Sequence, residues 1–113
     1  MEARATQKHI RVSPQKARLV VDLIRGKNAG EALSILAYTK KRVTQAVEKV
    51  LRSAIANAEQ KAEHLDVDQL VVSQAYVNEG PRSKRIRPAP MGRAYRYQRR
   101  MSHITVVVES PEA

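Results

Sequence analysis

Apolar side chains in the first part of the chain recur at helical spacing after a short extended segment. Residues 5–12 mix polar and apolar positions without a helical period, and we interpret them as an edge strand. Ser13-Pro14 then marks a helix start, because a Ser side chain can accept from an unpaired backbone N–H and Pro has no donor to lose at the first helical position. Apolar positions continue at intervals of three and four up to Gly26, a common helix terminator. The pattern therefore predicts a helix over about 14–25.

Two further helices are predicted before the middle of the chain. Asn28 followed by Glu31 is a capping-box pattern, and it starts a short helix that should end near Tyr38. We expect Thr39 to cap the longest helix, whose apolar residues form a single stripe. The stripe consists of Val43, Ala46, Val47, Val50, Leu51, Ala54, Ile55, Ala58 and Ala62. Because this stripe is short and rich in small Ala side chains, it indicates packing on a core and not a coiled coil.

The hydrophobic period changes to two after a polar loop at residues 64–66. Residues 70–78 read as a strand that is buried on at least one side. One of its faces is expected to carry Leu70, Val72 and Tyr76, and the other Val71, Ala75 and Val77. Residues 102–108, SHITVVV, are a second strong strand. We expect these two strands to pair as the inner part of a hairpin.

The segment between these strands is GPRSKRIRPAPMGRAYRYQRRMSH, residues 80–103. The simplest connection continues the pairing outward to a turn around residues 88–93, where Pro and Gly favour a reversal. A strand from Leu70 to Arg87 reaches roughly 55–60 Å at about 3.3 Å per residue, whereas a compact domain of this size has a radius of gyration of about 13 Å. The outer part of the hairpin should therefore project beyond the globular body.

Together these elements predict an α+β fold, in which a small body of three helices packs on a short antiparallel sheet and carries a long protruding β-hairpin. The chain of 113 residues is the size of one ordinary domain. We therefore expect residues 1–113 to form a single domain, with the hairpin extension at about 80–103. Because Phe and Trp are absent, the core must be built from Val, Ile, Leu and Ala.

The positive charge of the chain is distributed unevenly. Of the formal net charge of +10, residues 1–79 contribute thirteen basic and nine acidic side chains, and residues 80–108 contribute eight basic and no acidic ones. A field of this sign favours a polyanion, with nucleic acid ahead of an anionic membrane surface. No apolar run is long enough to span a membrane, and the first residues lack the apolar core of a signal peptide. The absence of Cys excludes disulfides and thiolate metal sites.

The basic segment has little means of stabilising itself as a hairpin. A lone two-stranded ribbon is marginally stable in water, and ordering each residue costs about 1–2 kcal/mol in backbone entropy. Phosphates can offset this cost and the charge repulsion, because seven of the eight cations are Arg, whose planar fork suits phosphate contacts. Tyr95 and Tyr97 fit stacking on unpaired bases or ordinary cross-strand packing equally well.

Catalysis finds little support in the pattern of chemical groups. His9, His64 and His103 are far apart and lack metal-binding spacing, and no Gly-rich phosphate loop is present. The acidic side chains around residues 59–68 lie at a helix end and in a loop, whereas a nuclease would gather carboxylates beside its basic surface. We therefore expect no catalytic residues, no metal site and no cofactor.

Three non-enzymatic alternatives remain beside an RNA-binding protein. A histone-like DNA-bending protein with a basic β-arm is the strongest of them, although such proteins act as dimers with paired arms. Because nothing in the sequence indicates a dimer interface, no homo-oligomer is expected. A membrane-surface module would need bulky apolar residues opposite a basic helical face, and the long helix presents Ala instead. A solvated basic loop is the plainest alternative.

Three motifs in this order resemble bacterial large-subunit ribosomal protein twenty-two: RVSPQKARLVVDLIRGK (11–27), VNEGPRSKRIRPAPMGRA (77–94) and SHITVVV (102–108). The resemblance covers nearly the whole chain. It implies a non-enzymatic constituent of the large ribosomal subunit in the cytoplasm, which binds 23S rRNA, contacts neighbouring ribosomal proteins and assists assembly. It also implies that the hairpin lines the nascent-peptide exit tunnel, with its tip near the nascent polypeptide and the macrolide site.

The resemblance also implies a set of RNA-facing residues. In the body these are Arg11, Lys16, Arg18, Arg25 and Lys27, with Ser13 as a cap. In and beside the extension they are Arg82, Lys84, Arg85, Arg87, Arg93, Tyr95, Arg96, Tyr97, Arg99, Arg100 and His103. The tunnel tip comprises Pro88, Ala89, Pro90, Met91, Gly92 and Arg93. From the residues alone, Lys16 and Arg18 fit a solvated helix face equally well, and His103 fits a structural role beside a buried strand.

Overall fold

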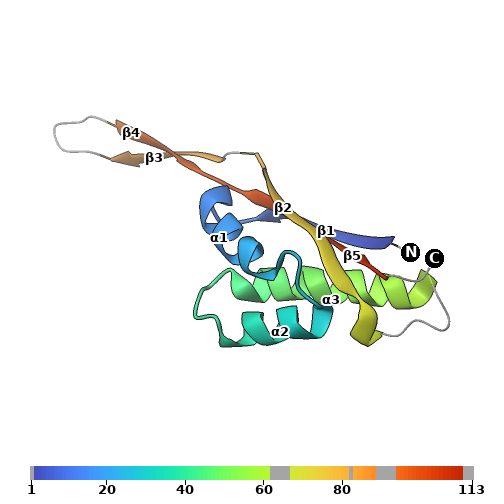
Figure 1. Ribbon diagram of the computed structural model, residues 1–113. Coiled ribbons are helices and arrows are strands. Elements are labelled where there is room, and N and C mark those ends of the chain that lie inside the picture. The colour runs from blue at the N-terminus through green and yellow to red at the C-terminus, as the bar shows by residue number, and fades with distance from the viewer. Residues whose placement is uncertain (1, 62–66, 82, 89–93, 111–113) are drawn as a thin grey trace.

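The computed structural model describes residues 2–61, 67–81, 83–88 and 94–110 (Figure 1). The elements in chain order are β1 (Glu2–Ile10), α1 (Pro14–Ile24), α2 (Ala29–Tyr38), α3 (Thr44–Lys61), the short 3₁₀ helix η1 (Val67–Gln69), β2 (Val71–Glu79), β3 (Ser83–Pro88), β4 (Ala94–Arg99) and β5 (Ser102–Glu109). This order confirms the predicted α+β fold. The predicted polar loop at residues 64–66 lies outside the described residues.

An antiparallel sheet with the strand order β1-β5-β2 forms the centre of the body. α1 packs on β2, α3 packs on β1 and β5, and α2 packs on α3 (Figure 1). The central position of β5 leaves every residue from Ile104 to Val108 no more than 4% exposed. The predicted edge strand is confirmed as β1, although it begins at Glu2 and ends at Ile10. The core consists of Val, Ile, Leu and Ala, as expected.

Local capping chemistry starts the first two helices where the sequence indicates. Ser13 Oγ accepts from the backbone N–H of Lys16 at 3.3 Å, and Pro14 is the first residue of α1. The chain leaves this helix through Gly26, whose φ of 80° lies in the left-handed region that favours glycine. Asn28 Oδ1 accepts from the backbone N–H of Gly30 at 2.9 Å and caps α2.

Replacing Asn28 with Ala is expected to lower the free energy of unfolding by about 1–2 kcal/mol, because two contacts are lost. One is the cap on Gly30, and the other is the bond from Asn28 Nδ2 to the carbonyl of Asp68, at 2.6 Å. Asn28→Asp is the matched control, since its carboxylate can still accept from Gly30 but cannot donate to Asp68. Urea unfolding followed by circular dichroism measures both changes, and an unchanged midpoint for Asn28→Ala would contradict the assigned cap.

The predicted cap of the longest helix is wrong. Thr39 ends α2, where its backbone N–H and its hydroxyl both donate to the carbonyl of Ile35, at 3.1 and 2.7 Å. α3 starts instead at Thr44, whose hydroxyl and backbone N–H donate to the carbonyl of Lys41, at 2.6 and 3.2 Å. A Thr hydroxyl can accept at a helix start or donate at a helix end. Here the chain needs residues 40–43 to turn from α2 into α3, so Thr39 closes the earlier helix (Figure 1).

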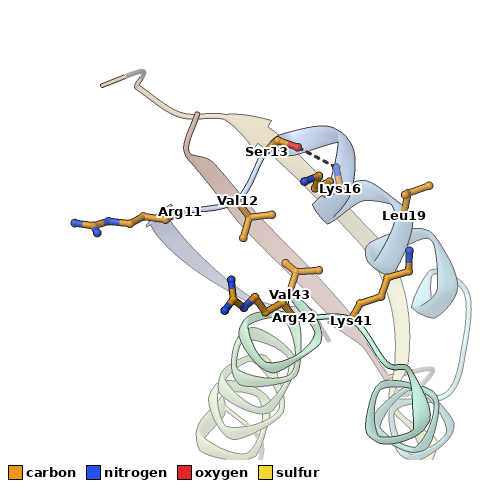
Figure 2. A pocket seen from close by; sticks show the side chains of 8 residues that line it. All are labelled: Arg11, Val12, Ser13, Lys16, Leu19, Lys41, Arg42 and Val43. Atoms are coloured by element: carbon orange, nitrogen blue, oxygen red, sulfur yellow. Dashed lines mark hydrogen bonds between the residues drawn. The ribbon is translucent and has the colours of Figure 1, made fainter. Parts of the chain in front are cut away.

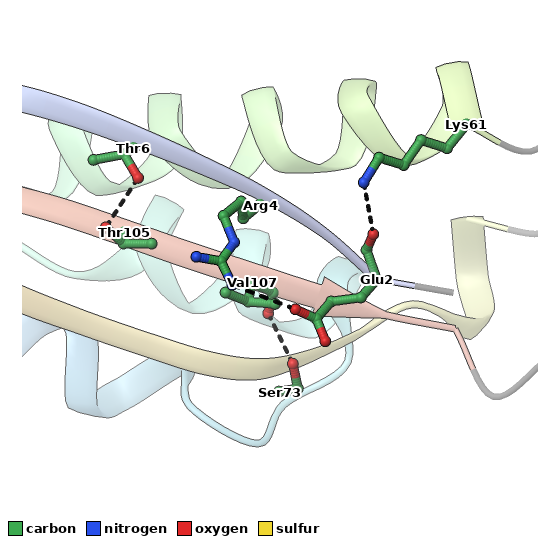
Figure 3. A network of polar contacts seen from close by, with 7 residues as sticks. All are labelled: Glu2, Arg4, Thr6, Lys61, Ser73, Thr105 and Val107. Carbon is green, nitrogen blue, oxygen red and sulfur yellow. Dashed lines mark hydrogen bonds and ion pairs between the residues drawn. The ribbon is translucent and has the colours of Figure 1, made fainter.

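A bulge in β2 corrects the predicted alternation of its faces. The pairing of β2 with β5 shifts after Val72, so Ser73 is the extra residue, and its Oγ donates to the carbonyl of Val107 at 3.3 Å (Figure 3). An extra residue exchanges the faces of all the positions that follow it. Val72 and Ala75 are therefore both buried, while Tyr76, which was grouped with Val72 in the sequence, is only half-buried.

Side chains of α3 cover carbonyl groups at the free edge of β1. Asn57 Nδ2 donates to the carbonyl of Arg4 at 2.9 Å, and Lys61 Nζ donates to the carbonyl of Glu2 at 3.0 Å. Figure 3 shows Lys61 reaching from the helix to the strand. Edge carbonyls that already have donors are less available for pairing with another chain. The edge of this sheet is thus closed by the helix that also packs on its face.

β3 and β4 form a separate two-stranded antiparallel sheet that projects from the body (Figure 1). At its base the backbone N–H of Gly80 donates to the carbonyl of Met101 at 2.8 Å. The radius of gyration is 17.4 Å and the longest axis measures 66 Å, against a radius of about 13 Å for a compact chain of this length. The predicted protruding hairpin is therefore confirmed. The turn was predicted around residues 88–93: Pro88 is the last residue of β3, where it pairs with Ala94, and residues 89–93 lie outside the described residues.

Candidate nucleic-acid interface

A basic groove lies on the body between the β1–α1 connection and the start of α3 (Figure 2). Its volume is about 560 Å³, and it is lined by Arg11, Val12, Ser13, Lys16, Leu19, Lys41, Arg42 and Val43. α1 presents Lys16 and Leu19 to solvent because Ala17 and Val20 occupy its buried stripe. Val12 and Val43 lie in the middle of the groove, with Lys16 and Lys41 on the side of α1 and Arg42 beside Val43, while the Arg11 side chain extends outward from the groove.

Four of the eight lining residues are cations and none is acidic. In the described part of the chain, the ion pairs are Arg4 with Glu2, Arg25 with Asp22 and Arg52 with Glu48. Arg11, Lys16, Lys41 and Arg42 therefore have no carboxylate partner among the described residues. Like charges gathered on one surface repel one another, and an anion in the groove would relieve that repulsion.

The basic surface continues toward the side of α3. A second cavity of about 380 Å³ shares Arg11 and Arg42 with the first, and it adds Lys49 together with polar residues of β1 and α3. The two cavities also share Val12 and Val43. They are thus parts of one surface with an apolar centre and a positive rim.

Lys41 and Arg42 were not among the residues expected to face RNA. The run Lys40-Lys41-Arg42 is visible in the sequence, but it directly follows Thr39, the residue that was expected to cap the longest helix. Because α3 starts at Thr44, the run lies instead in the loop between α2 and α3. The packing of α3 beside the β1–α1 connection then brings this loop to Arg11 and Lys16.

Two of the expected RNA-facing arginines have partners within the body. Arg18 Nη2 donates to the carbonyl of Val77 at 3.0 Å. Arg25 donates to the carbonyl of Ala75 from Nε and Nη2, at 3.1 and 2.6 Å, and also pairs with Asp22 at 2.7 Å. Ala75 and Val77 are alternate residues of the edge strand β2, so both arginines cover its free edge. The sequence indicated that these two arginines are exposed cations. It did not show that they bond to carbonyls of β2.

Lys27 is exposed beside this edge. It lies between α1 and α2, and its own carbonyl accepts from the backbone N–H of Val72 at 2.9 Å. Its backbone therefore helps to fix the connection to β2, and its side chain is accessible to solvent. The structure thus separates Lys27 from the groove that contains Arg11 and Lys16.

The extension brings most of the remaining expected RNA-binding positions onto two paired strands. The register pairs Ser83 with Arg99, Lys84 with Gln98, Arg85 with Tyr97, Ile86 with Arg96, Arg87 with Tyr95 and Pro88 with Ala94. Each tyrosine position therefore pairs with an arginine position. Arg100 is exposed at the base of the ribbon. Arg82 and the expected tip residues 89–93 lie outside the described residues.

His103 contributes to the base of the extension through protein contacts. Its Nδ1 accepts from the backbone N–H of His9 at 3.1 Å, and the two rings make an edge contact with centroids 5.1 Å apart. His9 has a φ of 61°, at the irregularity near the end of β1. A Cβ on Gly80 would lie 3.1 Å from His103 Cε1 and 3.1 Å from the carbonyl oxygen of Met101, so a larger residue here would need the ring or the strand to shift by a few tenths of an ångström. These contacts support the structural role that the sequence left open for His103.

The described residues contain neither a metal-type cluster of side chains nor a helix that could span a membrane. Within the described ranges, no group of three or more His, Asp or Glu side chains is placed to hold a metal ion. Among the helices of those ranges, none has the length and apolar character needed to cross a membrane.

The small α+β body and its projecting hairpin, which is rich in basic residues, suit an RNA-binding protein whose extension reaches beyond a folded body. The chain belongs to the family ribosomal protein L22p/L17e, whose model matches residues 5–109. It is 66% identical over 113 residues, the full length of both chains, to the large ribosomal subunit protein uL22 of Solibacter usitatus. It is 57% identical over 108 residues to the protein of the same name from Oceanobacillus iheyensis, covering 96% of this chain and 95% of the relative. The resemblance seen in the sequence is thereby confirmed.

Proposed function

We infer that this chain is a structural, non-enzymatic constituent of the large ribosomal subunit, bound to the subunit's rRNA through its body and its hairpin. The observation that carries the inference is the extension. A two-stranded ribbon leaves a body whose three helices, three-stranded sheet and connecting segments supply all the core residues with a described burial. The ribbon and its flanks, residues 80–103, carry eight basic side chains and no acid. The extension therefore needs a polyanionic partner to neutralise its charge.

Folded RNA fits this surface better than duplex DNA does. Arg and Lys contacts to phosphates supply affinity without reading sequence, while the shape of folded RNA determines placement. The hairpin belongs to a single chain, whereas DNA-bending proteins with basic arms use two arms of a dimer. The match to a ribosomal family over residues 5–109 supports the same choice.

The position that we propose within the ribosome is the one that the family resemblance implies. The body sits at the outer end of the nascent-peptide exit tunnel, and the hairpin lines the tunnel wall toward its tip at residues 88–93. Partners of this arrangement are large-subunit rRNA, neighbouring ribosomal proteins and the nascent polypeptide near the tip. The protein acts as one copy in the cytoplasmic ribosome, without self-association, and it assists subunit assembly by neutralising rRNA phosphates.

Sedimentation of a cell lysate tests this function directly. The protein should travel with large ribosomal subunits in a sucrose gradient, and limited RNase treatment should release it. Treatment with DNase is the matched control and should leave its position unchanged. If DNase released the protein and RNase did not, the DNA-bending alternative would replace the present inference.

A further inference from the structure

We propose that the basic groove on the body binds an unpaired nucleotide of ribosomal RNA, with phosphates on its cationic rim and the sugar or base over its apolar centre. This inference rests on the proposed rRNA-binding function and assigns that function a second contact site, separate from the hairpin. The rim is formed by Arg11, Lys16, Lys41 and Arg42, and the centre by Val12, Leu19 and Val43.

The charges of the rim call for an anion of phosphate type. All four cations lack a carboxylate partner among the described residues, and none of the lining residues is acidic. Arg11 and Arg42 come from opposite sides of the groove, and Lys41 extends toward α1 (Figure 2). Two arginines can each hold a phosphate through a planar pair of donors, and the lysines add point charges.

The apolar centre distinguishes a nucleotide from a bare anion. Leu19 is 55% exposed, on the face of α1 opposite the buried one. It lines the groove beside Lys16. Val12 is half-buried and Val43 is buried beneath the rim. A bare phosphate would use the rim and leave Leu19 in water. A ribose and an unstacked base can cover Leu19, and single-stranded RNA is the form in which bases are available. The proposed rRNA-binding function favours this occupant over an acidic peptide.

The size and place of the groove fit this occupant. A volume of about 560 Å³ lies within the range of small-ligand sites, about 300–1,000 Å³. The loop between α2 and α3 and the start of α1 lie at the end of the body from which the hairpin projects (Figure 1). RNA that follows the hairpin can therefore reach the groove without crossing the body.

The test compares two double variants that lose the same charge. Lys41→Gln with Arg42→Gln removes half of the rim, and Arg4→Gln with Arg52→Gln removes two exposed arginines that pair with Glu2 and Glu48. The probe is large-subunit rRNA transcribed in vitro, and affinity is measured over a range of salt concentrations. The groove variant should lower the slope of log affinity against log salt by about 1.4–1.8, since each lost phosphate contact removes about 0.7–0.9. The control should leave the slope nearly unchanged.

A third variant separates the apolar centre from the rim. Leu19→Gln should weaken binding about fivefold, from the loss of apolar contact area, and it should leave the salt slope unchanged because no charge is removed. An unchanged affinity for Leu19→Gln, with a reduced slope for the rim variant, would overturn the nucleotide in favour of a phosphate contact alone. Circular dichroism should show native melting for all variants, since every changed side chain is exposed.

The outcomes distinguish failure of this site from failure of the proposed function. If the wild type binds rRNA with a steep salt slope and the groove and control variants behave alike, the groove site is wrong and rRNA binding stands. If the wild type shows no salt-dependent rRNA binding, the proposed function itself fails. If the rim variant binds rRNA normally but is lost from purified large subunits, an acidic protein segment occupies the groove, and the nucleotide is excluded.

Discussion

Replacing Arg85, Arg96 and Arg99 with Gln is expected to weaken binding to large-subunit rRNA on the order of 10²–10³-fold at 0.1 M salt. Each arginine that neutralises a phosphate releases condensed counterions, which contributes about 0.7–0.9 to the slope of log affinity against log salt. Three contacts therefore give a loss of about 2–3 units in slope. The measurement is a binding titration at several salt concentrations with rRNA transcribed in vitro.

A matched variant shows whether position matters or only net charge. Arg4, Arg52 and Lys61 can be replaced with Gln to remove the same three charges from the body. These three side chains already have partners, because Arg4 pairs with Glu2, Arg52 pairs with Glu48, and Lys61 donates to the carbonyl of Glu2. We expect this variant to keep most of the affinity and slope. Equal losses in the two variants would mean that the hairpin arginines make no phosphate contacts of their own.

The parts of the fold that depend on local chemistry could be predicted from the sequence. Ser13 and Asn28 cap the helices they were expected to cap, because each side chain bonds to a backbone group within three residues. The long apolar stripe of α3 was equally clear, since a period of three to four residues depends only on that segment. The two strands of the inner hairpin were recognisable from their β-branched residues.

The features that the sequence did not predict depend on contacts between distant segments. Thr39 could have started one helix or ended another, and the choice depends on how many residues are needed between α2 and α3. The bulge at Ser73 depends on the register of β2 against β5, in which Ser73 bonds to Val107, 34 positions along the chain. An inserted residue leaves no mark in the composition of a strand, so the exchange of faces after Val72 could not be seen.

In the candidate interface, too, the contiguous features could be predicted from the sequence, and the features that combine distant segments could not. The basic hairpin was apparent because its charges are contiguous in the chain. The groove on the body was not, because it combines residues 11–19 with residues 41–43, which only the packing of α3 brings together. Arg18 and Arg25 looked free in the sequence, and they prove to cover carbonyls of β2. The number of basic residues in the sequence therefore indicates that the partner is a polyanion. The structure is needed to tell cations that are free on the surface from those that bond to carbonyls at the edge of β2.

The body and the ribbon differ in what stabilises them. The body has a core of apolar side chains from three helices and three strands. β3 and β4 pair only with each other among the described elements, and a lone two-stranded ribbon is marginal in water. The charges along it add repulsion that only an outside anion can remove. Our central claim is that rRNA stabilises the ribbon, whereas the body is stable by itself.

Amide hydrogen exchange of the purified protein, with and without rRNA, tests this claim most directly. In the free protein, amides of residues 83–87 and 94–99 should exchange within seconds, while those of β5 from Ile104 to Val108 should be protected by an opening free energy that approaches global stability, about 5–15 kcal/mol. Addition of rRNA should slow exchange in the ribbon by orders of magnitude and change β5 little. Strong protection of residues 83–87 and 94–99 in the free monomer would contradict the account.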